Sequence, residues 1–292
     1  MINLESGVAS RITLDVLGVD GAIRNSLQFC NVMTNYGLDS WAKGILGNHI
    51  ALGSGSRTEL PTATDLAAFV RTASGTYDYT NTNVIDEVNG VMRSDLVLNI
   101  VFPIETAAQN YSELGIHDNN RLALQTYARI RDAAGEPTSI GVQVGEQVRV
   151  SYVVQYSMPL TRTTNQTIGT NSTTVTAVAL RTGSTNGVRL PSPSVRFDSL
   201  FWAAGQGIPD AGVLPTGGVE PPQLPYISSG EYLFSAKLDQ LNLPGGISLI
   251  RMGGVGNGLG IMCHFNPPID KNDSVGLSIK VTAKLTNGVF YA

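Results

Sequence analysis

Alternation of apolar and polar residues with a period of two is the main pattern along this chain. It is clearest over 11–17 and 147–156, and such alternation predicts strands with one buried face. Further strands are expected over 22–30, 49–52, 88–104, 111–117, 122–131, 174–181, 195–203, 231–238 and 247–252, with two more between 259 and 285. The pattern therefore predicts a mainly β protein whose first part is an antiparallel β-sandwich.

Two short helices are expected to interrupt the strands. Thr34 or Asn35 is the expected N-cap of a helix that runs to about residue 46 and ends at Gly47. Pro61 and the Thr-Asp pair at 64–65 are expected to introduce a second helix over 66–70. Within the first helix, Trp41 is expected to anchor the helix to the sheet.

Several glycines lie where the chain is expected to turn or to pack closely. Val19-Asp20-Gly21 separates two predicted strands, and a turn of this composition closes a β-hairpin. We assign structural roles, in turns or close packing, to Gly21, Gly53, Gly55 and Gly115.

The organisation predicts two domains. Residues 1–160 are expected to form a β-sandwich domain with the short helices, and residues 161–292 a second, smaller β-rich domain. The polar, Thr-rich segment 157–174 is the expected connection. A Pro/Gly-rich stretch at 205–226 contains too many residues that break regular structure and is expected to form a long surface loop.

The two halves share one pattern of spacing. Ile140 precedes the alternating strand at 148–156 by eight residues, and Ile269 precedes the alternating strand at 277–285 by the same interval. Two interpretations stay open: unrelated half-buried strands that alternate alike, or two copies of one sandwich.

The amino-acid composition argues against a nucleic-acid-binding protein. Charged residues are 14% of the chain, against roughly 25% in typical globular proteins, and the formal net charge is −4. No basic stretch with interleaved aromatic residues occurs, so we expect no nucleic-acid partner. Lys280 and Lys284 fall on the polar side of an alternating strand, where they are expected to protect a sheet edge.

The cysteine content and the hydropathy of the chain indicate whether it is expected to be secreted or inserted in a membrane. Cys30 and Cys263 are far apart in sequence, which favours reduced, buried thiols over a disulfide scaffold. The N-terminus has no basic region followed by an apolar run, so we expect no signal peptide. No apolar stretch reaches the roughly 18 residues of a membrane span.

A search for catalytic chemistry finds only isolated residues. His49, His117 and His264 do not have metal-ligand spacing, and His117-Asp118 is read as a surface turn rather than an orienting pair. Acidic candidates for glycoside hydrolysis are chosen by residue type alone: Asp86, Glu87, Glu105, Glu113 and Asp118. The glycine run at 253–260 lacks G-x-G-x-x-G spacing and is read as a hairpin tip or an intersubunit contact. We therefore expect no enzyme, with no catalytic, cofactor-binding or metal-binding residue.

Several segments, in order, resemble tail-fibre and related virion proteins of tailed bacteriophages. The resemblance covers roughly 30–156 and is carried by Asn31-Val-Met-Thr-Asn-Tyr-Gly-Leu38, Ala51-Leu-Gly-Ser-Gly-Ser56, Leu60-Pro-Thr-Ala-Thr-Asp-Leu66, Ser112-Glu-Leu-Gly-Ile-His-Asp118, Tyr127-Ala-Arg-Ile130 and Val144-Gly-Glu-Gln-Val-Arg-Val-Ser-Tyr152. The second half matches no such motif. The resemblance implies a β-sandwich module of a virion appendage that works by homo-oligomerisation and docking, without catalysis.

These expectations define one hypothesis and two alternatives. The first is a structural virion component (tail, collar, baseplate or fibre), made in the host cytoplasm, that forms a symmetric trimer or hexamer and docks on other tail or portal-proximal proteins. The second is a fibre module that binds a host surface glycan by stacking aromatic residues on sugars, with candidates Tyr77, Tyr79, Trp202, Tyr226 and Tyr232. The third is a capsid decoration protein.

Overall fold

The computed structural model describes residues 2–42, 46–78, 84–118, 123–168, 171–181, 198–203, 226–228, 231–236, 243–253, 259–271 and 277–291. Within these ranges the protein is mainly β, with one helix and strands that form several mostly antiparallel sheets. This confirms the predicted fold class. In the same ranges, every helix is too short or too polar to cross a membrane.

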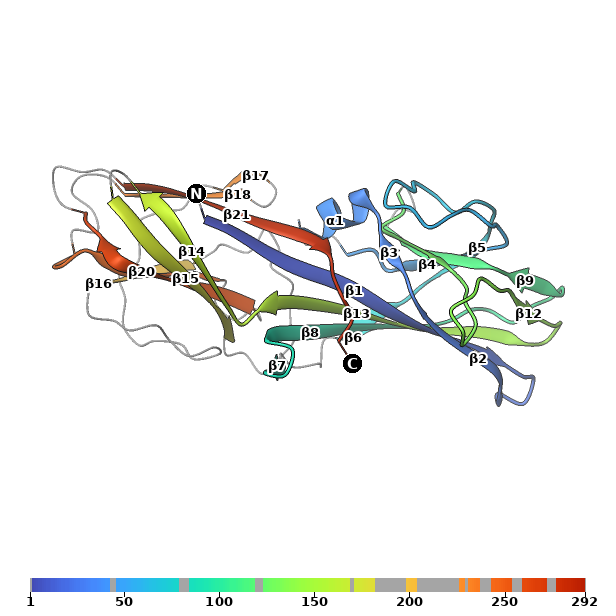
Figure 1. The fold of residues 1–292 in the computed structure, drawn as a ribbon. Helices are drawn as coiled ribbons and strands as arrows, with labels where there is room; N and C mark the ends of the chain where they lie inside the picture. The colour runs from blue at the N-terminus through green and yellow to red at the C-terminus, as the bar shows by residue number, and fades with distance from the viewer. Residues whose placement is uncertain are drawn as a thin grey trace.

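The largest sheet crosses the middle of the molecule (Figure 1). Its strands, in spatial order, are β17 (Tyr226–Ser228), β18 (Glu231–Ala236), β21 (Leu277–Asn287), β1 (Ile2–Leu17), β13 (Gln147–Pro159), β8 (Val91–Val101) and β6 (Thr76–Asp78), while β2 (Ile23–Cys30) pairs with β1 and β7 (Val84–Asp86) with β8. β21 runs parallel to the first half of β1, and the other pairs in this sheet are antiparallel.

Strands from both halves of the sequence therefore belong to one sheet. β21 pairs with β1 on one side and with β18 on the other, so the predicted division at residue 160 is not a division between sheets. Lys280 pairs with Leu233 of β18 and Lys284 with Glu5 of β1. Within the described residues each lysine is therefore paired on one side, and its expected role at a sheet edge stays a prediction.

A second sheet packs against the first and forms the core with it. Its order is β3 (Val32–Met33), β11 (Thr126–Arg129), β10 (Glu113–His117), β4 (His49–Gly53) and β5 (Phe69–Ser74), and β9 (Gln109–Tyr111) pairs with β12 (Ile140–Val142) beside it. One cluster of buried residues joins Leu14, Leu98 and Tyr152 of the first sheet to Ile50 and Leu114 of the second. Burial of these apolar faces is the main stabilising term for this part of the chain.

A third sheet lies at the end of the molecule away from the second (Figure 1). Its order is β14 (Thr161–Ile168), β15 (Asn171–Arg181), β20 (Leu259–Ile269), β19 (Ile247–Gly253) and β16 (Asp198–Ala203). The expectation of a connecting loop over 157–174 was wrong, because β14 and β15 form a regular hairpin there. Threonine is β-branched and favours strands even where its hydroxyl makes the segment polar. The predicted loop at 205–226, apart from Tyr226, and positions 254–258 of the glycine run lie outside the described residues.

One predicted helix is present and the other is not. α1 (Asn35–Ala42) begins as expected, with Thr34 as its N-cap, because the Thr34 hydroxyl accepts the main-chain N–H of Gly37 at 2.9 Å. The expected helix over 66–70 was wrong: the chain there is irregular and then enters β5. The main-chain N–H groups of Ala67 and Ala68 donate to a buried carboxylate, and Phe69 pairs with Gly53 of β4, so the segment continues as a strand.

The predicted hairpin between β1 and β2 is confirmed. Gly21 has a φ of 79° in its turn, a conformation that glycine adopts without strain. The expectation for the cysteines is confirmed in part, since both are free thiols and Cys263 is buried, whereas Cys30 on β2 is exposed.

Candidate functional site

Five of the six segments that carry the family resemblance lie around the second sheet, and the sixth, 144–152, leads into β13 of the first sheet. Three of the five supply the neighbouring strands β4, β10 and β11 of the second sheet, and another supplies β3 and α1. The segment 54–68, which connects β4 to β5, is irregular and contains the Leu-Pro-Thr-Ala-Thr-Asp-Leu motif. We call β3, β4, β10, β11, α1 and the segment 54–68 the motif module.

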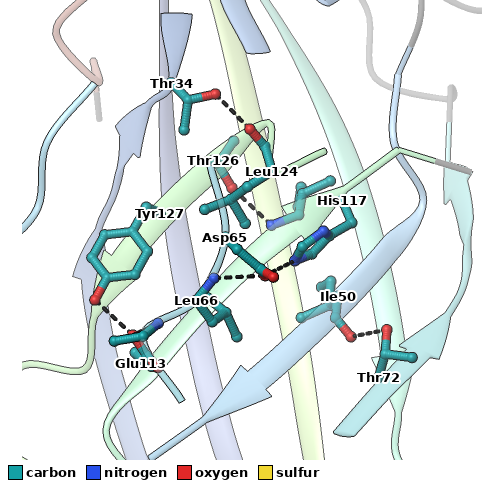
Figure 2. Close-up of polar contacts among 12 residues, drawn as sticks. Thr34, Ile50, Asp65, Leu66, Thr72, Glu113, His117, Leu124, Thr126 and Tyr127 are labelled. Atoms are coloured by element: carbon teal, nitrogen blue, oxygen red, sulfur yellow. Dashed lines mark hydrogen bonds and ion pairs between the residues drawn. The ribbon is translucent and has the colours of Figure 1, made fainter. Parts of the chain in front are cut away.

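Glu113 is the polar centre of the motif module. Its side chain is fully buried, and one carboxylate oxygen accepts the N–H groups of Gly55 at 3.1 Å and Ala68 at 2.7 Å. The other oxygen accepts the N–H of Ala67 at 3.0 Å and the hydroxyl of Tyr127 at 2.7 Å, and Figure 2 shows this last bond. Four donors surround this carboxylate, which compensates for its removal from water.

This environment also affects Tyr127. Burial, together with the hydrogen bond to Glu113, raises the pKa of the Tyr127 phenol above its usual value. The phenol therefore stays protonated and serves as a donor over the physiological pH range. The hydrogen bond from Tyr127 to Glu113 is therefore a structural contact between β11 and β10.

A second carboxylate, Glu59 within the segment 54–68, binds this segment to residues in and next to β11. Glu59 accepts the main-chain N–H of Arg129 at 2.7 Å and forms an ion pair with Arg131. The hydroxyl of Ser112 donates to the carbonyl of Gly55 at 2.6 Å. Strands β10 and β11 thus hold the irregular segment through side-chain to main-chain hydrogen bonds.

Gln125 joins the helix to the sheet. Its side-chain oxygen accepts the indole N–H of Trp41 at 2.8 Å and the N–H of Gly47 at 2.7 Å. Trp41 is itself buried in the core, which confirms its predicted role as an anchor. The Thr34 hydroxyl donates to the carbonyl of Leu124 at 2.6 Å (Figure 2). The residues next to β11 therefore fix both the start of α1 and the chain that follows it.

Glu105, another acidic candidate, lies in a separate buried group beside the module. It accepts the hydroxyl of Tyr111 at 2.6 Å and forms an ion pair with Arg71. Burial and the bond to Glu105 raise the pKa of Tyr111 to about 12. The group links β5 to β9.

The predicted His117-Asp118 turn does not lie on the surface as expected. His117 is buried at the end of β10, and its Nε2 lies 3.6 Å from a carboxylate oxygen of Asp65 in the segment 54–68 (Figure 2). Asp118 instead accepts the hydroxyl of Tyr36 at 3.2 Å. The two neighbours in sequence therefore face different partners.

Three of the glycines singled out from the sequence pack tightly inside the module. A Cβ at Gly115 would lie 2.2 Å from the carbonyl oxygen of Thr126, and a Cβ at Gly53 would lie 2.6 Å from that of Ala68. At Gly55 a Cβ would lie 2.4 Å from the Glu113 carboxylate. These contacts confirm the close-packing roles predicted for the three glycines.

The remaining candidates are dispersed. Asp86 accepts both the main-chain and the side-chain N–H of Asn89, which, with Arg93 nearby, lowers its pKa. Tyr77 was expected to be an exposed sugar-stacking residue and is buried, with its hydroxyl donating to the carbonyl of Gly47 at 2.7 Å. Tyr79 and the side chains of Trp202, Tyr226 and Tyr232 lie outside the described residues. In the described part of the chain, no group of three or more metal-ligating side chains comes together.

Sequence reasoning missed most of the polar network. Gln125, Glu59 and Arg71 carry no motif of their own, and their partners are 34 to 84 residues away in the sequence. A signal was present for Gln125 alone, a polar residue inside the otherwise apolar strand predicted over 122–131.

Comparison of the chain with protein-family models, with curated proteins and with solved structures finds no match. The fold and the motif module define this chain as a mainly β protein with a buried, hydrogen-bonded carboxylate at the centre of the module.

Proposed function

We propose that this chain is a structural component of a tailed-bacteriophage virion, part of a tail, collar, baseplate or fibre. It works by forming a symmetric oligomer and by docking on other virion proteins. No catalytic step is part of this proposal. The chain is made and assembled in the host cytoplasm.

The observation that carries the proposal is the convergence of the motifs. Five segments that resemble virion proteins are spread over residues 31–130, and they lie together in one module. Three of them, 51–56, 112–118 and 127–130, meet at the buried carboxylate of Glu113, and the segments 31–38 and 60–66 are joined by the hydrogen bond from the N–H of Asn35 to the carbonyl of Pro61. Segments that matched by chance would have no reason to share hydrogen bonds. Their contacts support reading the resemblance as one structural unit.

The contacts of three carboxylates, buried Glu113 and Glu105 and partly buried Glu59, are in keeping with a structural role. Glu113 is bonded to main-chain N–H groups and to a tyrosine, and Glu59 and Glu105 are each ion-paired with an arginine. A carboxylate that acts on a substrate needs an oxygen that the substrate can reach. The carboxylate oxygens of Glu59, Glu105 and Glu113 are instead bonded to groups of the loops and strands around them, which they stabilise.

The test is the mass of the purified full chain by light scattering, followed by negative-stain imaging. A trimer, a hexamer or a larger ring or rod is expected. A chain that stays monomeric at every concentration would contradict the self-assembly part of the proposal. Binding to a glycan array by such a monomer would favour a receptor-binding module instead.

A further inference from the structure

The dipeptide Asn-Gly occurs four times in the sequence, at 89–90, 186–187, 257–258 and 287–288. The first and the last of these pairs lie in the described part of the chain. Asparagine is among the thermolabile residues. Glycine has no side chain to shield its main-chain nitrogen, so this nitrogen can attack the side-chain amide of the asparagine before it. The two described pairs have this chemistry in common and differ in their surroundings.

Asn89-Gly90 lies in the exposed turn that connects β7 to β8 (Figure 1). Gly90 has a φ of 64°, a left-handed conformation that favours glycine, so the turn itself selects the residue that leaves the nitrogen unshielded. Among the described residues, no atom other than those of its chain neighbours lies within 4 Å of the position that a Cβ of Gly90 would take. The N–H of Gly90 donates to the carbonyl of Glu87 at 3.3 Å, which is a long hydrogen bond.

Asn287-Gly288, at the end of β21, is held by both its side chain and its main chain. The side-chain oxygen of Asn287 accepts the N–H of Met33 at 3.0 Å, and the NH₂ group of Asn287 donates to the carbonyl of Met33 at 3.3 Å. The N–H of Gly288 donates to the carbonyl of Val8 at 2.8 Å, and a Cβ at Gly288 would lie 2.9 Å from the Cα of Gly7. Hydrogen bonds and packing therefore fix the atoms that would have to meet.

From this contrast we propose that Asn89 is a site of spontaneous covalent modification in the folded chain, whereas Asn287 is protected. The main-chain nitrogen of Gly90 gives its proton to solvent and forms a bond to Cγ of Asn89, and the bond from Cγ to Nδ2 breaks, so that Nδ2 leaves as ammonia. Water then opens the resulting cyclic imide. Attack of water at Cγ leaves aspartate at position 89, and attack at the main-chain carbonyl carbon leaves isoaspartate. No oxidation or reduction takes place.

Asp86 restrains Asn89 before the reaction and is affected by its product. One carboxylate oxygen of Asp86 accepts the side-chain NH₂ of Asn89 at 2.8 Å, and the other accepts the main-chain N–H of Asn89 at 3.0 Å. The first of these bonds must break before the amide nitrogen can leave. In the aspartate product a carboxylate stands in place of the NH₂ group, and two like charges repel each other. The modification therefore weakens the turn between β7 and β8.

Peptide mapping of the full chain by mass spectrometry, during incubation at mildly alkaline pH, tests the site. Trypsin separates the two pairs, because it cuts after Arg93 and after Lys284. In the folded chain we expect Asn89 to be converted at least about tenfold faster than Asn287, since Asn287 and its glycine must first lose three hydrogen bonds. In concentrated urea both pairs lose their surroundings, and the two rates are expected to converge.

Asp86→Ala tests the restraint, and we expect it to raise the rate at Asn89 about fivefold. Asp132→Ala is the control, because Asp132 holds a different turn, the one before β12, and the rate at Asn89 should not change. Equal rates at Asn89 and Asn287 in the folded chain, or faster conversion of Asn287, would overturn the proposed site. A rate that Asp86→Ala leaves unchanged would overturn the role of Asp86. The modification does not depend on the proposed function, so either failure leaves that function standing.

Discussion

Glu113→Gln is the substitution that tests the motif module most sharply. The two side chains have nearly the same shape, so the change removes the charge and replaces one acceptor oxygen by an NH₂ group. Each oxygen of Glu113 accepts two donors. Whichever way the amide is oriented, its NH₂ group faces two groups that were donors to the carboxylate.

The magnitude follows from the number of hydrogen bonds lost. If the NH₂ group faces Ala67 and Tyr127, the phenol can rotate to accept, and one buried N–H is left without a partner; in the other orientation two N–H groups are. An unsatisfied buried donor costs about 1–3 kcal/mol, and the two remaining bonds lose their charge assistance. We expect a loss of about 3 kcal/mol in the free energy of unfolding.

The assay is urea unfolding of the full chain, with tryptic cleavage after Arg57 as a local readout. Arg57 lies in the segment that Glu113 holds, so cleavage there is expected to become faster. Glu136→Gln is the control, because Glu136 is an exposed carboxylate in the turn before β12. A Glu113→Gln chain within about 0.5 kcal/mol of this control, with unchanged cleavage, would refute the role of Glu113.

Three further predictions follow from packing and ionisation. Gly115→Ala is expected to cost about 2–3 kcal/mol in urea unfolding, since its Cβ would meet a main-chain oxygen of β11, whereas Gly141→Ala, with open space around it, should be nearly neutral. The pKa of Tyr111 is raised to about 12, so its contribution to the free energy of unfolding is complete below about pH 10 and is lost as pH rises towards 12. Urea unfolding midpoints measured between about pH 9 and 12 check this. If the Tyr111→Phe chain loses as much stability over this range as the wild type, the prediction is contradicted. A maleimide reagent at neutral pH should modify Cys30, which is exposed, and spare Cys263, whose burial raises its pKa to about 12; equal labelling by mass spectrometry would refute the placement of both.

The sequence pattern predicted the long, half-buried strands β1, β8 and β13, because a period of two reports directly on burial, whereas β5, β6, β7 and β12 were not predicted. The hairpin at Gly21 and the helix capped by Thr34 were also predictable, since a turn glycine and an N-cap act through neighbouring residues. The failure at 66–70 has a non-local cause. The local signals there favoured a helix, but Glu113, more than forty residues away, binds the N–H groups of Ala67 and Ala68, and Phe69 pairs with Gly53 of β4.

Long separation in the sequence is also the reason why most of the polar residues in and beside the motif module were not predicted. Gly115 was predicted to pack closely, because a glycine within a strand indicates a near approach of the backbone. Gln125 and Glu59 were not found, since neither changes the periodicity around it. Most of β15 was predicted, whereas β14 was missed for a different reason: its strand propensity comes from threonine, and a polar strand at a sheet edge shows no apolar alternation.

Association with virus particles tests the central proposal most directly. Particles from a culture whose genome encodes the chain would be purified on a density gradient and probed with an antibody against it. We expect the chain to sediment with the particles and gold-labelled antibody to mark their tail or tail-proximal parts in the electron microscope. A chain found only in the soluble fraction, with unlabelled particles, would contradict the proposal.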